Sequence, residues 1–318
     1  MARPLFHGNV IALIWDFDQT LIPGYQQQPM FDHFKVSPGD FWDEVNGLAD
    51  FYKAQDVVVS TDTLYLNHIL TYVREGKFAN LTNDMLKNFG QQLTFYPGMP
   101  EFLEQSKAAI EGDARYRDHS ITVEHYIVST GLRHLMKGSA VAPHVAEIWG
   151  CDFIESPAAS GYLTAPAAPP ASPPVITQVG YFLDNTTKTR AIWEINKGCN
   201  KDPKIGVNDL ISQDDRRVPL RNMIYVADGP SDVPVFSILN NFGGRTLGVH
   251  NGSDAHYEQV AKLGTQGRVQ HFTEADYRPN REAYRWIMKQ LRELATLIVQ
   301  DRERLRAEHV QPAAKHVT

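Results

Sequence analysis

Cysteine is scarce in this sequence, with only Cys151 and Cys199 among 318 residues. Two cysteines are too few for a disulfide framework, and their spacing does not fit a zinc site. Long apolar runs are also missing, and the first apolar run is short and ends at Asp16. We therefore expect free thiols and, with no signal peptide or membrane span visible, a cytoplasmic location.

An excess of positive charge is missing as well. The chain has 31 Lys and Arg against 37 Asp and Glu, a formal net charge of −6. This balance argues against nucleic acid or an anionic membrane as the main partner. A small anionic substrate stays compatible with it, because a bound cation can outweigh the net charge locally. The hydrophobic content of 42% is enough for a sizeable core.

One stretch joins an apolar run directly to a cluster of polar groups. Residues 10–15 have the length and β-branched content of a buried parallel strand, and Asp16, Asp18 and Thr20 follow at its carboxyl end. Ligands bind at the carboxyl ends of the strands in open α/β sheets. We expect chemistry at this point, the alternative being that these residues only form a turn.

The next strand comes unusually late. Residues 121–128 predict a strand that leads into Ser129, whereas a plain strand, helix and strand unit takes about 30 residues in all. Helical patterns occupy most of the surplus, beginning with a helix capped by Ser37. We expect residues 23–95 to form an inserted helical cap and residues 99–110 to form the crossover helix of the sheet.

The rest of the chain alternates between helix and strand patterns, as in a parallel α/β sheet. The strand over 222–227 again delivers two aspartates at its carboxyl end, Asp228 and Asp232. The predicted fold is α/β, a three-layer Rossmann-like parallel sheet core made of residues 1–22 and 96–318 with the inserted α-helical cap. The other segments are helices over 135–149, 188–197 and 233–239, and strands over 152–155, 178–183, 245–249 and 269–272.

Two segments stand apart from this alternation. Residues 157–174 contain six prolines, which exclude a regular helix or a central strand. A surface excursion is expected there, with a proline-rich binding motif as the alternative. Residues 281–308 predict a long terminal helix whose apolar stripe packs on the core or forms a homodimer contact.

The polar groups at the strand ends resemble the four motifs of the haloacid-dehalogenase-like superfamily of aspartyl phosphotransferases. The first motif is DFDQT from Asp16 to Thr20, and the second is Ser129 with Thr130 and Gly131. The third is Lys188, and the fourth is DGPSD over residues 228–232. The resemblance covers about residues 8–275, and its layout is similar to that of the phosphoserine phosphatase branch.

The resemblance implies a Mg²⁺-dependent phosphatase that hydrolyses a small phosphorylated metabolite through an aspartyl phosphate. Oxygen ligands without a Cys or His cluster also favour Mg²⁺. Asp16 is the expected nucleophile, and Asp18 the expected general acid and base. The expected metal ligands are Asp16, the main-chain carbonyl of Asp18, Asp228 and, through water, Asp232. The phosphate oxygens are expected to contact Lys188, the Ser129 hydroxyl and the N–H groups of Phe17 and Thr130.

Several assignments have competitors. Lys188 is preferred to Lys197 because it begins a helix and can point back to the strand ends, and Ser129 is preferred to Thr130 because it directly ends the strand. Three basic residues could contact the substrate, but we expect their side chains to be solvated instead: Arg74, Lys77 and Arg133. His125 is expected to be a core residue rather than a ligand.

The sequence predicts the class of reaction in more detail than it predicts the substrate. Asp18 disfavours dehalogenation, because dehalogenases lack this second acid. The alternatives to a phosphatase are a phosphotransferase or mutase with the same chemistry, and a catalytically silent protein that binds a phosphoryl ligand. Tyr25 stands where the phosphoserine phosphatase branch has an acidic residue, so the sequence does not identify the substrate.

Overall fold

The computed structural model describes residues 8–164 and 174–309, and its centre is a seven-stranded sheet in the order β4-β3-β2-β1-β5-β6-β7. Neighbouring strands are parallel except β3 and β4, which are antiparallel. The strands are β1 (Val10–Trp15), β2 (Thr122–Leu132), β3 (Glu147–Ile154), β4 (Gln178–Tyr181), β5 (Met223–Ala227), β6 (Arg245–His250) and β7 (His271–Glu274). The predicted α/β class with a mostly parallel sheet is confirmed.

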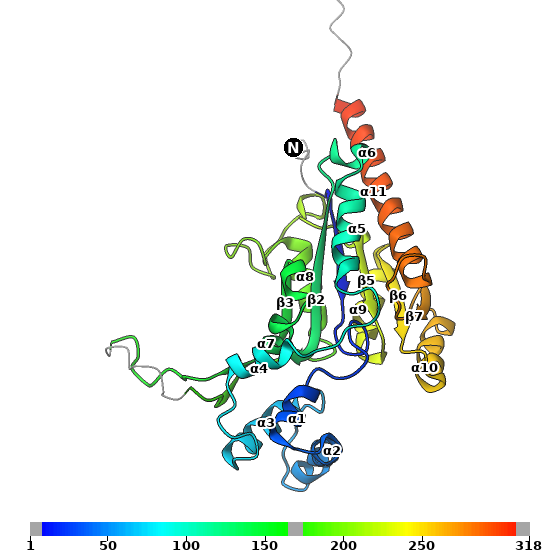
Figure 1. Cartoon of the computed structure of the whole chain (residues 1–318). Helices are drawn as coiled ribbons and strands as arrows, with labels where there is room; N and C mark the ends of the chain where they lie inside the picture. Colours follow the sequence, from blue (N-terminus) through cyan, green and yellow to red (C-terminus); the bar gives the residue numbers. More distant parts are fainter. Residues whose placement is uncertain (1–7, 165–173, 310–318) are drawn as a thin grey trace, which may run out of the picture.

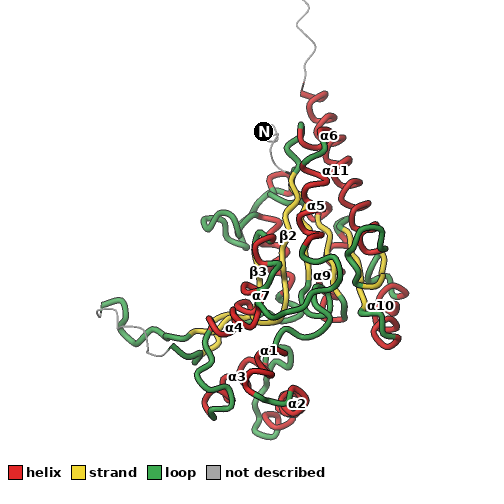
Figure 2. The backbone as a smooth tube through the Cα atoms, viewed as in Figure 1, coloured by secondary structure: helices red, strands yellow, loops and turns green. Residues whose placement is uncertain are grey.

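Helices cover both faces of this sheet, as Figures 1 and 2 show. On one face, Leu13 and Trp15 of β1 pack with apolar residues of α5 and α11, such as Phe102 and Ile287. On the other face, Ile14 packs with residues of α8 and α9. The helices are α1 (Gln28–Phe34), α2 (Pro38–Lys53), α3 (Leu64–Arg74), α4 (Asn83–Gly90), α5 (Glu101–Glu111), α6 (Ala114–Arg117), α7 (Arg133–Gly138), α8 (Lys188–Lys197), α9 (Val233–Asn241), α10 (Asp254–Thr265) and α11 (Glu282–His309).

The helical insert between β1 and β2 lies beyond the carboxyl ends of the strands (Figure 1). Helix α2 begins as expected, with the Ser37 side chain accepting a hydrogen bond from the Asp40 N–H at 3.2 Å. Helix α4 instead packs against α7, where a Cβ on Gly138 would come within 1.7 Å of the Lys87 carbonyl oxygen. The insert is therefore in contact with the sheet-associated helices, and the division at residues 23 and 95 stays a prediction.

Several predicted elements were wrong in extent. The expected helix over 135–149 ends at Gly138, and β3 begins at Glu147 after a short turn of 3₁₀ helix that contains Pro143. The last apolar residues of this segment, Ile148 and Trp149, pair instead with Ile127 and Val128 of β2. β2 itself continues through Ser129 to Leu132, and α10 was not predicted.

The structure describes only part of the proline-rich segment, residues 157–174, but it describes the terminal helix predicted over residues 281–308. Residues 157–164 are exposed, and residues 165–173 of the proline-rich stretch lie outside the described residues. Helix α11 forms where a long helix was predicted, and it buries Ile287, Leu291 and Ile298 against the core. The homodimer contact stays a prediction. In the described ranges, no helix has the length and apolar character needed to cross a membrane.

His125 is a core residue, as the sequence predicted, and its ring is fully hydrogen-bonded. The Trp15 indole N–H donates to Nδ1 at 3.2 Å, and Nε2 lies 3.0 Å from the Leu103 carbonyl oxygen. This arrangement requires a neutral ring with its proton on Nε2. Burial lowers the pKa of His125 to about 3.

Because the unfolded chain protonates His125 near its ordinary pKa, acid should destabilise the fold through this residue. The contribution is complete above about pH 6.5 and is lost as the pH falls toward the folded-state value. We expect a loss of about 2 kcal/mol in unfolding free energy between pH 7 and 5, measured by urea denaturation. His125→Gln should remove this part of the pH dependence. An NMR signal of the His125 ring that titrates near pH 6.5 in the folded protein would contradict the assignment.

Candidate active site

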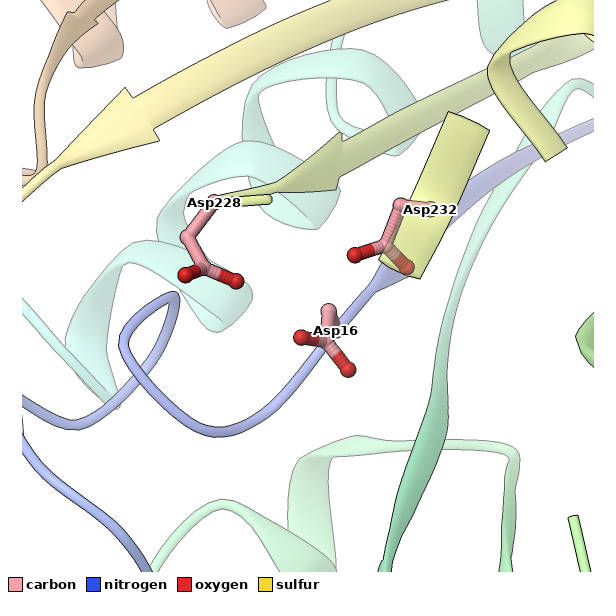
Figure 3. Close-up of side chains that lie close together, drawn as sticks. All are labelled: Asp16, Asp228 and Asp232. Atoms are coloured by element: carbon pink, nitrogen blue, oxygen red, sulfur yellow. The ribbon is translucent and has the colours of Figure 1, made fainter. Parts of the chain in front are cut away.

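Three aspartates from two distant parts of the chain meet at the carboxyl edge of the sheet (Figure 3). Asp16 directly follows β1, Asp228 directly follows β5, and Asp232 lies in a 3₁₀ turn that leads into α9. β1 and β5 are neighbours, and the Asp16 N–H donates to the Val226 carbonyl at 2.9 Å. One carboxylate oxygen from each aspartate lies within 4.8 Å of the other two.

The Lys188 ammonium joins two of these carboxylates. Its Nζ atom donates to Asp16 Oδ1 at 3.0 Å and to Asp232 Oδ1 at 2.6 Å, and the residue is only 1% exposed. Burial alone would lower the pKa of Lys188, but the charges of Asp16 and Asp232 hold it above its usual range. The side chain is therefore a fixed cation at the centre of the cluster.

The turn before α8 directs Lys188 toward the cluster. The Asp184 side chain accepts hydrogen bonds from the N–H groups of Thr186 and Thr187, at 2.9 and 2.6 Å. These bonds satisfy amide groups at the start of the helix, where no carbonyl of the helix can reach them. Lys188 is the first residue of the helix, so its long side chain can extend back to the ends of the strands.

The cluster carries more negative than positive charge. Burial raises the pKa of Asp16 well above its ordinary value, with Lys188 opposing and Asp232 and Asp228 adding to the rise. Burial also raises the pKa of Asp228, although His256 lies 3.3 Å away and lowers it. Three ionised carboxylates and one ammonium leave a net charge of minus two, which a divalent cation would balance.

The donor set fits Mg²⁺. Asp16, Asp228 and Asp232 offer hard carboxylate oxygens at one buried point, the ligand type that Mg²⁺ prefers. Asp232 already accepts hydrogen bonds from Lys188, from the Tyr225 hydroxyl at 2.6 Å and from the Ser231 hydroxyl at 2.9 Å. Little acceptor capacity remains on Asp232, which favours contact with an ion through water.

Asp18 lies two residues beyond the nucleophile candidate and is held by Gln26. The Gln26 N–H donates to Asp18 Oδ1 at 2.9 Å. Burial raises the pKa of Asp18 to about 7, although the Gln26 hydrogen bonds act in the opposite direction. A carboxyl group with this pKa can both give and take a proton near neutral pH.

The candidate phosphate-binding residues other than Lys188 lie near the cluster, Ser129 and Thr130 on β2 and Phe17 directly after Asp16, beyond the end of β1. Ser129 is 2% exposed, and its hydroxyl accepts a hydrogen bond from the Gly131 N–H at 3.1 Å. The Thr130 carbonyl accepts a hydrogen bond from the Tyr65 hydroxyl at 2.7 Å, and the Phe17 ring packs against Phe95 in the core. Among the described residues, no hydrogen bond links these groups to the three aspartates.

The competing basic residues are bonded elsewhere. Lys197 donates to the carbonyl oxygens of Val207 and Asp209, at 2.6 and 2.7 Å. Arg133 pairs with Glu147 and Asp152. The structure thus brings Lys188 into the cluster and ties Lys197 to a loop.

Sequence reasoning missed three side chains around the site, Gln26, Tyr225 and His256. Tyr225 had a usable signal, because a tyrosine inside an apolar strand needs a partner for its hydroxyl. Gln26 and His256 had none. Gln26 lies only eight residues beyond Asp18, but its contact depends on the shape of the turn between them, and His256 reaches Asp228 only when α10 folds beside the sheet.

Comparison with known proteins identifies a relative. No family model matches the chain. An uncharacterized protein of Borreliella burgdorferi is 39% identical over 287 residues, which cover 89% of this chain and 97% of that protein. The chain belongs to the family of that protein. The likeness extends over most of both chains, but it assigns no activity to the family.

Solved structures similar to this family member are more distant. A HAD family hydrolase from Salmonella enterica serovar Typhi is 11% identical with a TM-score of 0.49, covering 84% of this chain and 67% of that one. A phosphoserine phosphatase, described as a phospho-aspartyl intermediate analogue, is 13% identical with a TM-score of 0.45, covering 83% and 92%. Its structural neighbours thus include HAD hydrolases. Likenesses this distant transfer no activity or substrate.

If the three aspartates hold Mg²⁺, the ion should stabilise the fold. At Mg²⁺ concentrations about 100 times the dissociation constant, we expect a gain of about 2.7 kcal/mol in unfolding free energy. Calorimetric titration with Mg²⁺ should show one site, and Asp228→Asn should weaken binding at least about 10-fold. The exposed residue Asp50 supplies the matched control, Asp50→Asn. An unchanged Mg²⁺ affinity in Asp228→Asn would contradict the site.

The Lys188 ammonium should matter for stability without any metal. Lys188→Met leaves buried carboxylates without their cation and should lower the unfolding free energy by about 3 kcal/mol. Lys197→Met is the matched control, because it removes a half-buried ammonium that only bonds carbonyl groups, at a cost of about 1 kcal/mol. Equal losses in the two variants, measured by urea denaturation in Mg²⁺-free buffer, would show that the cluster does not need its cation.

Proposed function

We propose that the protein is a Mg²⁺-dependent phosphatase that hydrolyses a small phosphate monoester through an aspartyl phosphate on Asp16. One observation carries the proposal: the buried Asp16 carboxylate is held by Lys188 beside two further carboxylates, with a second acid two residues along the chain. A turn that served only the fold would gain nothing from this concentration of buried charge, which costs stability.

Asp16 is the nucleophile in the proposed reaction. Asp16, Asp228 and Asp232 would hold a Mg²⁺ ion, whose charge offsets the repulsion between a carboxylate and a phosphate dianion. A carboxylate oxygen of Asp16 forms a bond to phosphorus while the bond from phosphorus to the ester oxygen breaks. The protonated carboxyl group of Asp18 gives its proton to the departing oxygen, so that an alcohol leaves.

The second step restores the enzyme. Asp18, now ionised, takes a proton from a water molecule that attacks the phosphorus of the aspartyl phosphate. Inorganic phosphate leaves, and Asp16 is again a free carboxylate. The Lys188 ammonium, the Ser129 hydroxyl and the N–H groups of Phe17 and Thr130 are the proposed donors to the phosphate oxygens in both steps.

Residues 23–95 are proposed to select the substrate as a cap over the site. Two hydrogen bonds support this role, because one joins the insert to β2 beside Ser129 and the other joins it to the turn before Lys188. The Tyr65 hydroxyl donates to the Thr130 carbonyl, next to Ser129, and Asp62 accepts a hydrogen bond from the Asn185 N–H at 3.4 Å, three residues before Lys188.

The proposal is tested by phosphate release from p-nitrophenyl phosphate and a panel of phosphorylated metabolites with Mg²⁺. We expect Mg²⁺-dependent turnover that falls at least about 1,000-fold in Asp16→Asn, which keeps the shape of the nucleophile but not its charge. Asp118→Asn, at an exposed aspartate outside the insert, is the control and should keep full activity. Removal of Mg²⁺ with EDTA should also stop turnover.

Other outcomes would favour the other candidate functions. Turnover that survives in Asp16→Asn would refute the aspartyl phosphate. Labelled phosphate that passes to an acceptor other than water would indicate a phosphotransferase or mutase. Binding of phosphorylated ligands without release from any member of the panel would indicate a catalytically silent protein.

A further inference from the structure

Gln26 is a fully buried amide that lies between Asp18 and the end of β2. The residue is 0% exposed, and its Oε1 atom accepts a hydrogen bond from the Leu132 N–H at 2.9 Å. Because a backbone N–H can only donate, the amide oxygen must face Leu132, and the amide nitrogen must point the other way. The nitrogen faces the carboxyl group of Asp18, 3.4 Å from each of its oxygens.

The backbone of Gln26 adds a second and shorter contact with Asp18. Its N–H donates to Asp18 Oδ1 at 2.9 Å. Among the described residues, all side-chain hydrogen bonds of Asp18 come from Gln26. One residue therefore restricts both the position and the rotation of this carboxyl group.

Gly131 of β2 leaves the space that the Gln26 amide occupies. A Cβ on Gly131 would lie 1.8 Å from Gln26 Nε2, so only glycine leaves room for the amide at this position of β2. Gln26 is thus tied to the strand that carries Ser129 on one side and to Asp18 on the other. The amide therefore connects Asp18 of the first motif with the strand that carries Ser129 of the second motif.

We propose that Gln26 is a positioning residue that keeps the Asp18 carboxyl group aimed at the oxygen of the leaving group. The inference rests on the proposed function, since it assigns a role in the proton transfer of the first step. Proton transfer requires donor and acceptor to be held within hydrogen-bonding reach and in line. Loss of the amide should therefore slow the departure of groups that need a proton.

Substituted phenyl phosphates test this role, because they share a shape but differ in how much their leaving group needs a proton. In Gln26→Met, we expect kcat/KM for phenyl phosphate to fall about 10-fold or more, and kcat/KM for p-nitrophenyl phosphate to fall less than about 3-fold. The parameter kcat/KM is measured because it reports the first step. Asp18→Asn should show the same dependence on the leaving group, only steeper.

A matched control and a second variant separate positioning from folding. Gln105→Met makes the same substitution at an exposed side chain of α5, outside the insert and the site, and should leave both rates unchanged. Gln26→Glu keeps an acceptor for the Leu132 N–H but replaces the amide nitrogen that faces Asp18. It should reproduce the selective loss even if Gln26→Met does not fold.

The possible results are distinguishable. An equal loss for both substrates, or no loss, in folded Gln26 variants of an active enzyme would overturn the positioning role and leave the proposed function intact. A wild-type protein that releases no phosphate with Mg²⁺ would overturn the proposed function and this inference together.

Discussion

Buried charge is the constraint on which the other features of this protein rest. Asp16, Asp228 and Asp232 lie within 4.8 Å of one another, and like charges at that distance inside a protein are unfavourable unless a cation is present. The Lys188 ammonium supplies one positive charge through two short hydrogen bonds. The remaining excess of carboxylate groups makes the site suited to a divalent cation.

The order of the strands explains why these residues meet. β1 lies between β2 and β5, so the turns after the three strands share one edge of the sheet although they are far apart in the chain. Asp16 follows β1 and Asp228 follows β5, while Ser129 lies near the end of β2. The helical insert leaves from this same edge (Figure 1), which places Gln26 and Tyr65 against residues of the site.

Sequence reasoning was accurate where local signals fix the structure, and it was less accurate where contacts between distant segments decide it. β1, β5 and α8 were predicted nearly to the residue because apolar runs and a terminal glycine are local signals. The helix over 135–149 was predicted too long. Residues 135–138 are helical, but residues 147–149 belong to β3, because only pairing with β2 decides between helix and strand there. α10 was overlooked, although the Ser253 cap is a local signal.

By itself the sequence determined which chemical groups stand at the ends of the strands, because their identity and their position after an apolar run are local properties. Only the tertiary structure decided their partners. Lys188 rather than Lys197 reaches Asp16, Tyr225 and Ser231 fill the acceptors of Asp232, and Gln26 holds Asp18. A hydrogen bond depends on the distance and direction between two atoms, whether their residues are neighbours, as Ser231 and Asp232 are, or 172 residues apart, as Asp16 and Lys188 are. Spacing along a sequence carries no such information.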